Sequence, residues 1–149
     1  LQFYERYFEL DPGMFNLETA KAAYLVPEQQ VQLVLDKYGA RIGSAIIRDN
    51  DQIGIGWSEV ERRFHTLTAN HDRIRQQLAF LPKAKQIRDV YHKMDYPWPA
   101  QAIGIDDQLL LNSLLYAKEY RNRYTVFKSA HELGVLDKLV AQVIQDLSK

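Results

Sequence analysis

The chain has no cysteine among its 149 residues. This absence excludes disulfides, thiolate metal ligands and a cysteine nucleophile, and we expect a protein of the reducing cytoplasm. An excess of charge of one sign is also missing, because 19 Lys and Arg balance 19 Asp and Glu. A neutral chain has no electrostatic bias toward nucleic acid or acidic lipid, so we expect no nucleic-acid partner.

Long apolar runs and glycine-rich catalytic motifs are missing as well. No apolar run approaches the about 20 residues of a membrane-spanning helix, so we expect no insertion into a membrane, and no signal peptide is visible. Gly54 and Gly56 lack the third glycine of a dinucleotide fingerprint, since Glu59 stands at its position. The sequence also contains no Gly-x-Ser-x-Gly elbow and no Gly-Lys-Ser/Thr phosphate loop.

Apolar residues at helical spacing run through almost the whole sequence. The length is typical of one domain, and 46% hydrophobic and 26% charged residues are ordinary globular values. Asn16 and Thr125 are expected to cap helices, while Gly39 and Gly134 are expected to end them. Two prolines predict an aromatic loop at residues 96–99. The sequence therefore predicts an all-α fold, with residues 1–149 forming a single helical domain.

One further helix boundary can be predicted from capping chemistry. Ser58 and Glu61 have the spacing of a capping box, which favours a helix from Glu59 onward. Either one long helix follows, or two helices that are broken near Thr66. Histidines are scattered at positions 65, 71, 92 and 131.

No two of these histidines have the i, i+4 spacing that places two imidazoles on one helix face. Glu61 and His65 have that spacing, but a metal ion needs three or four converging ligands. The sequence favours a surface Glu61–His65 pair, solvated histidines elsewhere, and no metal site in this chain.

The beginning of the chain is amphipathic from Leu1 onward, with Phe3, Tyr4, Tyr7 and Phe8 close together. Natural domains rarely begin in the middle of a helix. We therefore expect the C-terminal fragment of a longer chain, with a native start after removal of a tag as the alternative. A missing neighbour would leave the four aromatic residues exposed, and exposed apolar patches promote association. This predicts self-association and a homo-oligomer.

The most distinctive segment runs from Gly104 to Thr125. Asp106 or Asp107 is expected to cap an apolar helix that reaches about Tyr120, and a cationic and aromatic junction follows. The candidate anion contacts in this segment are Asp106, Arg121, Arg123, Tyr124 and Thr125.

The two arginines of this junction have two interpretations. Cations at the end of a helix complement its dipole, which is worth ~0.3–1 kcal/mol each. Alternatively, Arg121 or Arg123 reaches an anionic substrate, since guanidinium forks match phosphate oxygens. The residues alone favour the structural interpretation, because the dipole effect needs no partner.

Five motifs also occur in a fixed order, and together they resemble a known family. They are Glu18-Thr19-Ala20-x-x-Ala23-Tyr24, Leu81-Pro82-x-Ala84, Ile103-Gly104-Ile105-Asp106, Leu114-Leu115-Tyr116-Ala117-Lys118-Glu119-x-Arg121-x-Arg123-Tyr124-Thr125-Val126, and Glu132-Leu133-Gly134-Val135-Leu136. The chain is similar to the C-terminal helical region of bacterial sn-glycerol-1-phosphate dehydrogenases, which belong to the iron-containing alcohol dehydrogenase and dehydroquinate synthase-like superfamily. The resemblance is strongest from about residue 78 to residue 136.

The resemblance implies a two-domain enzyme that interconverts glycerol 1-phosphate and dihydroxyacetone phosphate. An N-terminal α/β domain would bind NAD(P), and a C-terminal helical domain would supply an Asp and two His to a divalent metal. The last of these ligands lies in a His-Gly motif upstream of the matched region, and this chain contains no His-Gly dipeptide. No catalytic, cofactor-binding or metal-binding residue is therefore assigned here.

The partner implied by the resemblance is the missing nucleotide-binding domain, and we expect no dehydrogenase activity from this chain alone. Two alternatives stay open. In the first, the chain is a free-standing helical interaction or oligomerisation module, with its apolar N-terminal segment as the contact. In the second, the chain belongs to an enzyme of the same superfamily, but the substrate is glycerol or another polyol.

Overall fold

The computed structural model describes residues 1–97 and 100–147, and that part of the chain contains helices and loops without a β-strand. The helices are α1 (Gln2–Phe8), α2 (Leu17–Ala23), α3 (Pro27–Asp49), α4 (Trp57–Gln77), α5 (Ala84–Lys93), α6 (Asp107–Tyr116), α7 (Val126–Glu132) and α8 (Leu136–Leu147). Short 3-10 helices span Pro12–Met14 (η1), Ala100–Ile103 (η2) and Ala117–Glu119 (η3). The predicted all-α class is confirmed.

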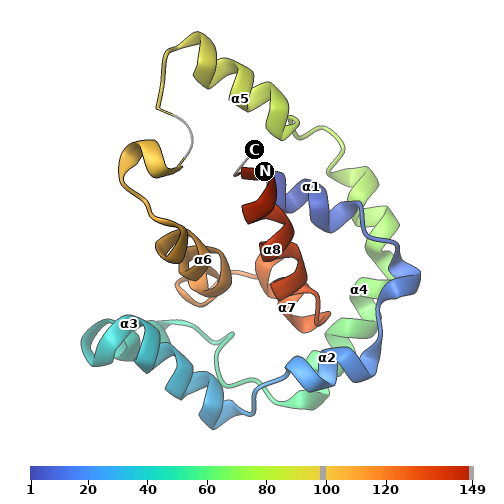
Figure 1. Ribbon diagram of the computed structural model, residues 1–149. Helices are drawn as coiled ribbons and strands as arrows, with labels where there is room; N and C mark the ends of the chain where they lie inside the picture. Colours follow the sequence, from blue (N-terminus) through green and yellow to red (C-terminus); the bar gives the residue numbers. More distant parts are fainter. Residues whose placement is uncertain (98–99, 148–149) are drawn as a thin grey trace.

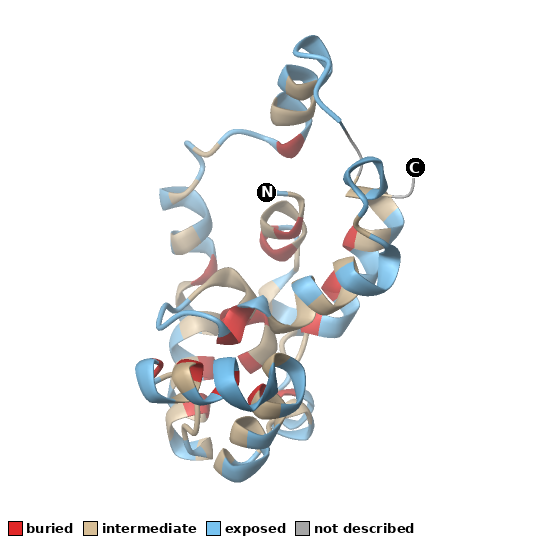
Figure 2. Cartoon of the chain, turned by 90° about the vertical axis from the view of Figure 1, so that its left-hand side faces the viewer, coloured by how far each residue is buried: buried red, intermediate tan, exposed pale blue. Residues whose placement is uncertain are grey.

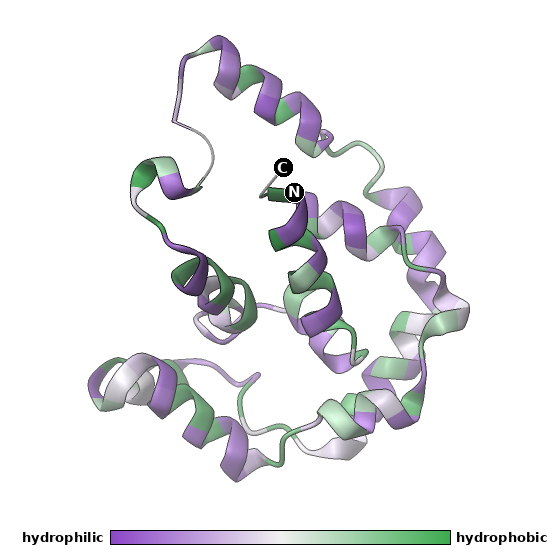
Figure 3. Ribbon diagram, viewed as in Figure 1, coloured by the Kyte–Doolittle hydropathy of each residue, from purple (hydrophilic) through white to green (hydrophobic). Residues whose placement is uncertain are grey.

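Helices α7 and α8 lie at the centre of the molecule, and the other helices surround them (Figure 1). Helix α8 packs against α1, α6 and α7, while α7 also contacts α2 and α4. The core lies along this pair of helices and includes Leu133, Leu139 and Val140, each at most 1% exposed. Helix α5 lies at the rim, where most of its residues are exposed and hydrophilic (Figures 2 and 3).

The aromatic side chains of α1 belong to the core. Phe3, Tyr7 and Phe8 are 4%, 3% and 9% exposed, and Tyr4 packs at the edge of the same cluster. Phe3 stacks on Phe127 of α7 with ring centroids 4.0 Å apart. The expectation that this face is left exposed by a missing neighbour is wrong, because α7 and α8 of the same chain cover it. The prediction of self-association therefore no longer has an exposed aromatic surface to support it.

Local capping and stop signals act as the sequence predicts. Asn16 accepts hydrogen bonds from two backbone N–H groups at the start of α2, and Thr125 caps α7. Gly39 interrupts α3 with a φ of 74°. Gly134 ends α7 with a φ of 72°, and a Cβ at this position would lie 2.9 Å from the backbone of Thr19. Glycine is therefore required at position 134 for its conformation and for the space.

Two predicted boundaries differ from the structure. Helix α4 is one long helix that begins at Trp57, so Ser58 lies inside it instead of capping it. Helix α6 ends at Tyr116 and passes into η3, whereas the sequence predicted a helix to about Tyr120. A side chain is hydrogen-bonded to one of the last carbonyl groups of α6, because the Lys118 ammonium donates to the carbonyl of Leu115.

One histidine is buried, contrary to the expectation that all of them are solvated or paired at the surface. His71 is 2% exposed, and its ring contacts Tyr7, Phe8 and Phe15 at centroid distances of 5.5, 5.3 and 5.3 Å. Neither ring nitrogen has a hydrogen-bond partner in the described part of the chain. Burial lowers the pKa of His71.

Two further sequence predictions concern the aromatic loop and the absence of a membrane-spanning helix. Trp98 and Pro99, half of the predicted aromatic loop, lie outside the described residues, as do Ser148 and Lys149. None of the described helices combines the length and the apolar character needed to cross a bilayer.

Candidate functional site

An open pocket of about 580 Å³ lies between the first half of α3 and the C-terminal end of α6. We call it the cationic pocket, because four cations and no carboxylate appear among the described residues that line it. The charged and aromatic lining residues are Lys37, Tyr38, Tyr116, Lys118, Tyr120, Arg121 and Arg123. The pocket therefore combines positive charge with aromatic surface.

Two hydrogen bonds join α3 and the residue after it to the end of α6 and to η3, beside this pocket. The Tyr38 hydroxyl donates to the carbonyl of Tyr116 at 2.8 Å. The amide of Asn50, a buried residue that follows α3, donates to the carbonyl of Glu119 at 2.8 Å. These contacts bring Lys37 to the pocket, with its ammonium 4.5 Å from the centroid of the Tyr116 ring.

Arg121 and Arg123 follow η3 and are exposed at the pocket. In the described part of the chain, neither guanidinium has a hydrogen bond or ion pair. The last carbonyls of α6 have other partners, because the Tyr38 hydroxyl and the Lys118 ammonium bind them. The geometry therefore weakens the interpretation of the arginines as partners of the helix end.

The other candidate residues divide between the pocket and the helix starts. Thr125 lines the pocket and also caps α7, where its hydroxyl accepts from the Lys128 N–H at 3.3 Å. Asp106 caps α6, accepting from the Leu109 N–H at 2.7 Å. It does not line the pocket, and α6 separates it from Arg121.

Tyr124 lies on a different surface from the two arginines. Its hydroxyl donates to the carboxylate of Glu132, and its ring centroid is 5.2 Å from the guanidinium carbon of Arg63. Burial raises the pKa of Tyr124, and the Glu132 charge raises it further. The structure thus brings together Arg121, Arg123 and Thr125, but not Asp106 or Tyr124.

Behind the cationic pocket lies a buried charge cluster, formed by Lys118, Glu119, Lys128, Glu132 and Arg63. Lys118 and Lys128 approach Glu119 at 3.0 and 3.5 Å, and their side chains are 3% and 4% exposed. Burial lowers the pKa of Lys118. Burial alone would raise the pKa of Glu119, but the two lysines hold it below its usual range. Each buried charge in this half of the cluster has an opposite partner.

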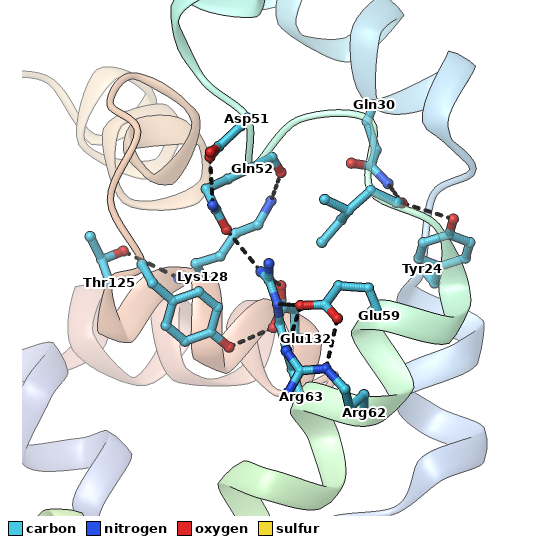
Figure 4. Close-up of polar contacts among 12 residues, drawn as sticks. Tyr24, Gln30, Asp51, Gln52, Glu59, Arg62, Arg63, Thr125, Lys128 and Glu132 are labelled. Carbon is cyan, nitrogen blue, oxygen red and sulfur yellow. Dashed lines mark hydrogen bonds and ion pairs between the residues drawn. The ribbon is translucent and has the colours of Figure 1, made fainter.

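Glu132 and Arg63 form the second half of the buried charge cluster (Figure 4). The Glu132 carboxylate is 2% exposed and lies 3.1 Å from the Arg63 guanidinium. Burial raises the pKa of Glu132, while its bonds to Tyr124 and Arg63 act against this. Arg63 also contacts Glu59 at 2.6 Å, and hydrogen bonds from Arg62 and Arg63 lower the pKa of Glu59 to about 2.

His131 lies against the lysines of the cluster and lines the neighbouring small cavities. Burial lowers its pKa to about 4, and the charges of Lys118 and Lys128 lower it further, against the opposing effect of Glu119. A neutral imidazole is therefore the stable form near pH 7.

In the described part of the chain, no residues match the metal site or the nicotinamide-nucleotide site that the resemblance implies. Within residues 1–97 and 100–147, no three His, Asp or Glu side chains converge so that they could hold a metal ion. The loop with Gly54 and Gly56 joins α3 to α4 and follows no strand, so it lacks the context of a dinucleotide fingerprint. We assign no step of metal or hydride chemistry to this chain.

Lys37, Tyr38 and Lys118 are site residues that sequence reasoning did not single out. In the sequence, Lys37 and Tyr38 place a cation next to an aromatic residue directly before the predicted helix break at Gly39, and the junction after α6 has a similar composition. This similarity is the feature of the sequence that could have identified them as site residues. No local pattern shows that residues so far apart in the sequence share one pocket.

Comparisons with protein-family models, curated proteins and solved structures give no match for this chain. Its function therefore has to be argued from the cationic pocket and from the motifs of the sequence.

Proposed function

We propose that the chain is a helical part of a metal- and NAD(P)-dependent polyol-phosphate dehydrogenase of the glycerol-1-phosphate type. In this proposal the cationic pocket contacts a phosphate group of the enzyme's ligand. The observation that carries the phosphate contact is the presence of Arg121 and Arg123 beside Lys37 on one open pocket without a carboxylate in its described lining.

The chemistry of these side chains suits a phosphate ester. Arginine presents N–H donors in a planar fork that can bind two phosphate oxygens at once, and lysine adds a point charge. The buried charge cluster behind the pocket is internally paired, so its carboxylates are not free to neutralise Arg121 and Arg123. Uncompensated cations on a concave surface also attract anions before contact.

The type of enzyme in this proposal rests on the resemblance, and an all-helical fold agrees with what the resemblance implies for this region. The metal and the nucleotide would then be held by other parts of the parent protein. The alternative of an oligomerisation module loses support, since the aromatic face of α1 that would form its contact is buried within the chain.

Ligand binding to the 149-residue chain tests the phosphate contact. We expect glycerol 1-phosphate to bind at low salt, as followed by NMR chemical shifts, and glycerol to give no measurable binding. The double variant Arg121→Gln/Arg123→Gln should lose about tenfold or more in affinity, because charge-assisted hydrogen bonds are removed.

The matched control is Arg73→Gln, which changes an exposed arginine of α4 that does not line the pocket. It should bind glycerol 1-phosphate like the unchanged chain. Equal binding by the double variant and the control would overturn the phosphate contact. Equal binding of glycerol and glycerol 1-phosphate would instead favour an unphosphorylated polyol as the ligand.

An activity assay tests the expectation that the chain is a part of the enzyme and not the whole. With NADH, dihydroxyacetone phosphate and a divalent metal, we expect no oxidation of NADH above background. Turnover by the purified 149-residue chain would contradict that expectation directly.

A further inference from the structure

The cationic pocket has an aromatic wall that a three-carbon phosphate does not need. Tyr38, Tyr116 and Tyr120 line it together with Arg121 and Arg123. The volume of about 580 Å³ is also much larger than such a small ligand fills. Pockets of this size in other proteins accept ligands as large as drugs and cofactors. The ligand chemistry that uses both features is a phosphate joined to a planar ring.

The three tyrosines differ in how much ring surface they leave for a ligand. The ring of Tyr116 is already covered by the Lys37 ammonium at 4.5 Å. Tyr38 is fixed through its hydroxyl, which donates to the Tyr116 carbonyl at 2.8 Å. Tyr120 is 55% exposed, and its centroid lies 6.3 Å from that of Tyr38 at an interplanar angle of 35°. Tyr120 is therefore the stacking surface most open to a ligand, with Tyr38 as a fixed aromatic neighbour.

We propose that the cationic pocket binds a nucleoside monophosphate, with the phosphate on Arg121 and Arg123 and the base stacked on Tyr120. The inference rests on the proposed function, since it uses the same arginines, and it names the ligand class of that site. Tyr120 directly precedes Arg121 in the chain, so one short segment supplies both the stacking ring and the phosphate donor. Aromatic rings stack on every type of base, so the pocket accepts nucleotides with little preference for the base.

A mononucleotide suits the pocket better than a nucleic-acid strand. A strand needs a positively charged groove that follows several phosphates, and its binding is driven by many cations. Here two exposed cations at the site that have no ion pair in the described part of the chain, Arg121 and Arg123, lie in one pocket, and the chain as a whole has no net charge. The site therefore provides one phosphate position and one stacking position.

The test compares AMP, adenosine and glycerol 1-phosphate as probes on the 149-residue chain by NMR titration. We expect AMP to bind about tenfold more tightly than glycerol 1-phosphate, because stacking adds to the phosphate contact. Tyr120→Ala should reduce the affinity for AMP to that for glycerol 1-phosphate and leave the latter unchanged. Tyr120→Phe keeps the ring and should retain AMP binding.

Tyr96→Ala is the matched control, because Tyr96 is also 55% exposed but does not line the pocket. It should bind AMP normally. AMP binding that is no tighter than glycerol 1-phosphate binding, or that survives Tyr120→Ala, overturns the nucleotide inference and leaves the proposed function standing. Failure of both AMP and glycerol 1-phosphate to bind would overturn the phosphate contact and, with it, the nucleotide inference that rests on it. An oligonucleotide that binds more tightly than AMP would contradict a mononucleotide site.

Discussion

Two sets of cations lie in and near the short segment that contains η3, and they differ in their surroundings. On the inner side, Lys118 and Lys128 are buried and share the carboxylate of Glu119. On the pocket side, Arg121 and Arg123 are exposed and have no ion pair in the described part of the chain. Lys118 and Arg121 are three residues apart in sequence, yet their surroundings are opposite.

This difference shows that the surroundings of a cation, and not its place in a motif, decide what it contributes. A buried ammonium must be paired, since an isolated charge in the interior is very costly. The inner set is therefore tied to the folded state. An exposed guanidinium contributes little to folding, so the pocket set can be changed without loss of the fold and is available for a ligand.

The largest effect is expected from breaking the inner set with Glu119→Gln. This change leaves Lys118 and Lys128 buried without their shared carboxylate, and we expect the free energy of unfolding to fall by about 3–5 kcal/mol. Urea denaturation followed by circular dichroism measures the loss. The control is Asp89→Asn, which removes an exposed ion pair with Lys85 on α5. It should cost far less than Glu119→Gln, because exposed ion pairs contribute little to stability. Equal losses in both variants would remove the contrast between buried and exposed pairs.

The inner set also predicts a dependence of stability on pH through His131. Burial, with help from Lys118 and Lys128, lowers its pKa to about 4 in the folded protein. The unfolded chain therefore binds the proton more readily between about pH 6.5 and pH 4, so stability is complete above that range and is lost as the pH falls. The loss amounts to about 3 kcal/mol at pH 4.

Urea midpoints measured from pH 7.5 down to pH 4.5 check this prediction. His131→Gln removes the titrating ring, so its stability should decline less steeply than that of the unchanged chain. Parallel curves for the two proteins would show that His131 does not cause the loss.

A smaller effect is expected at the edge of the buried cluster. Tyr124→Phe removes the hydroxyl that donates to Glu132 but keeps the ring beside Arg63. Because Glu132 is still paired with Arg63, the loss should be about 1–3 kcal/mol. Thermal unfolding at neutral pH measures it, and an unchanged midpoint would mean that the hydroxyl bond adds nothing to stability.

The smallest effect on folding is expected from the pocket set. Arg121→Gln and Arg123→Gln should each change the free energy of unfolding by no more than about 0.5 kcal/mol, as usual for exposed positions. Chemical denaturation of both variants provides the measurement. A loss above about 1 kcal/mol would return these arginines to the role of helix-end partners that their sequence position first indicated.

The sequence was sufficient to predict features that depend on near neighbours in the chain. The caps at Asn16 and Thr125 and the breaks at Gly39 and Gly134 follow from local backbone chemistry, and each is present. The all-α class follows from the helical spacing of apolar residues.

Features that depend on distant segments could not be predicted in this way. The spacing of Phe3, Tyr7 and Phe8 shows an apolar face, but not that α7 and α8 cover it. The carbonyl of Tyr116, at the end of α6, accepts a hydrogen bond from Tyr38, which is 78 residues away. The pocket itself was not predicted for the same reason: the sequence indicated Arg121 and Arg123 as candidate anion contacts, but one side of the pocket comes from α3.

The central claim is that the pocket set of cations binds an anionic ligand and does not support the fold. The most direct measurement is AMP affinity in Arg121→Gln/Arg123→Gln, together with its unfolding free energy in the same buffer. We predict an affinity at least about tenfold weaker, with stability within about 1 kcal/mol of the unchanged chain. Unchanged affinity, or a loss of binding that is accompanied by a matching loss of stability, would contradict the claim.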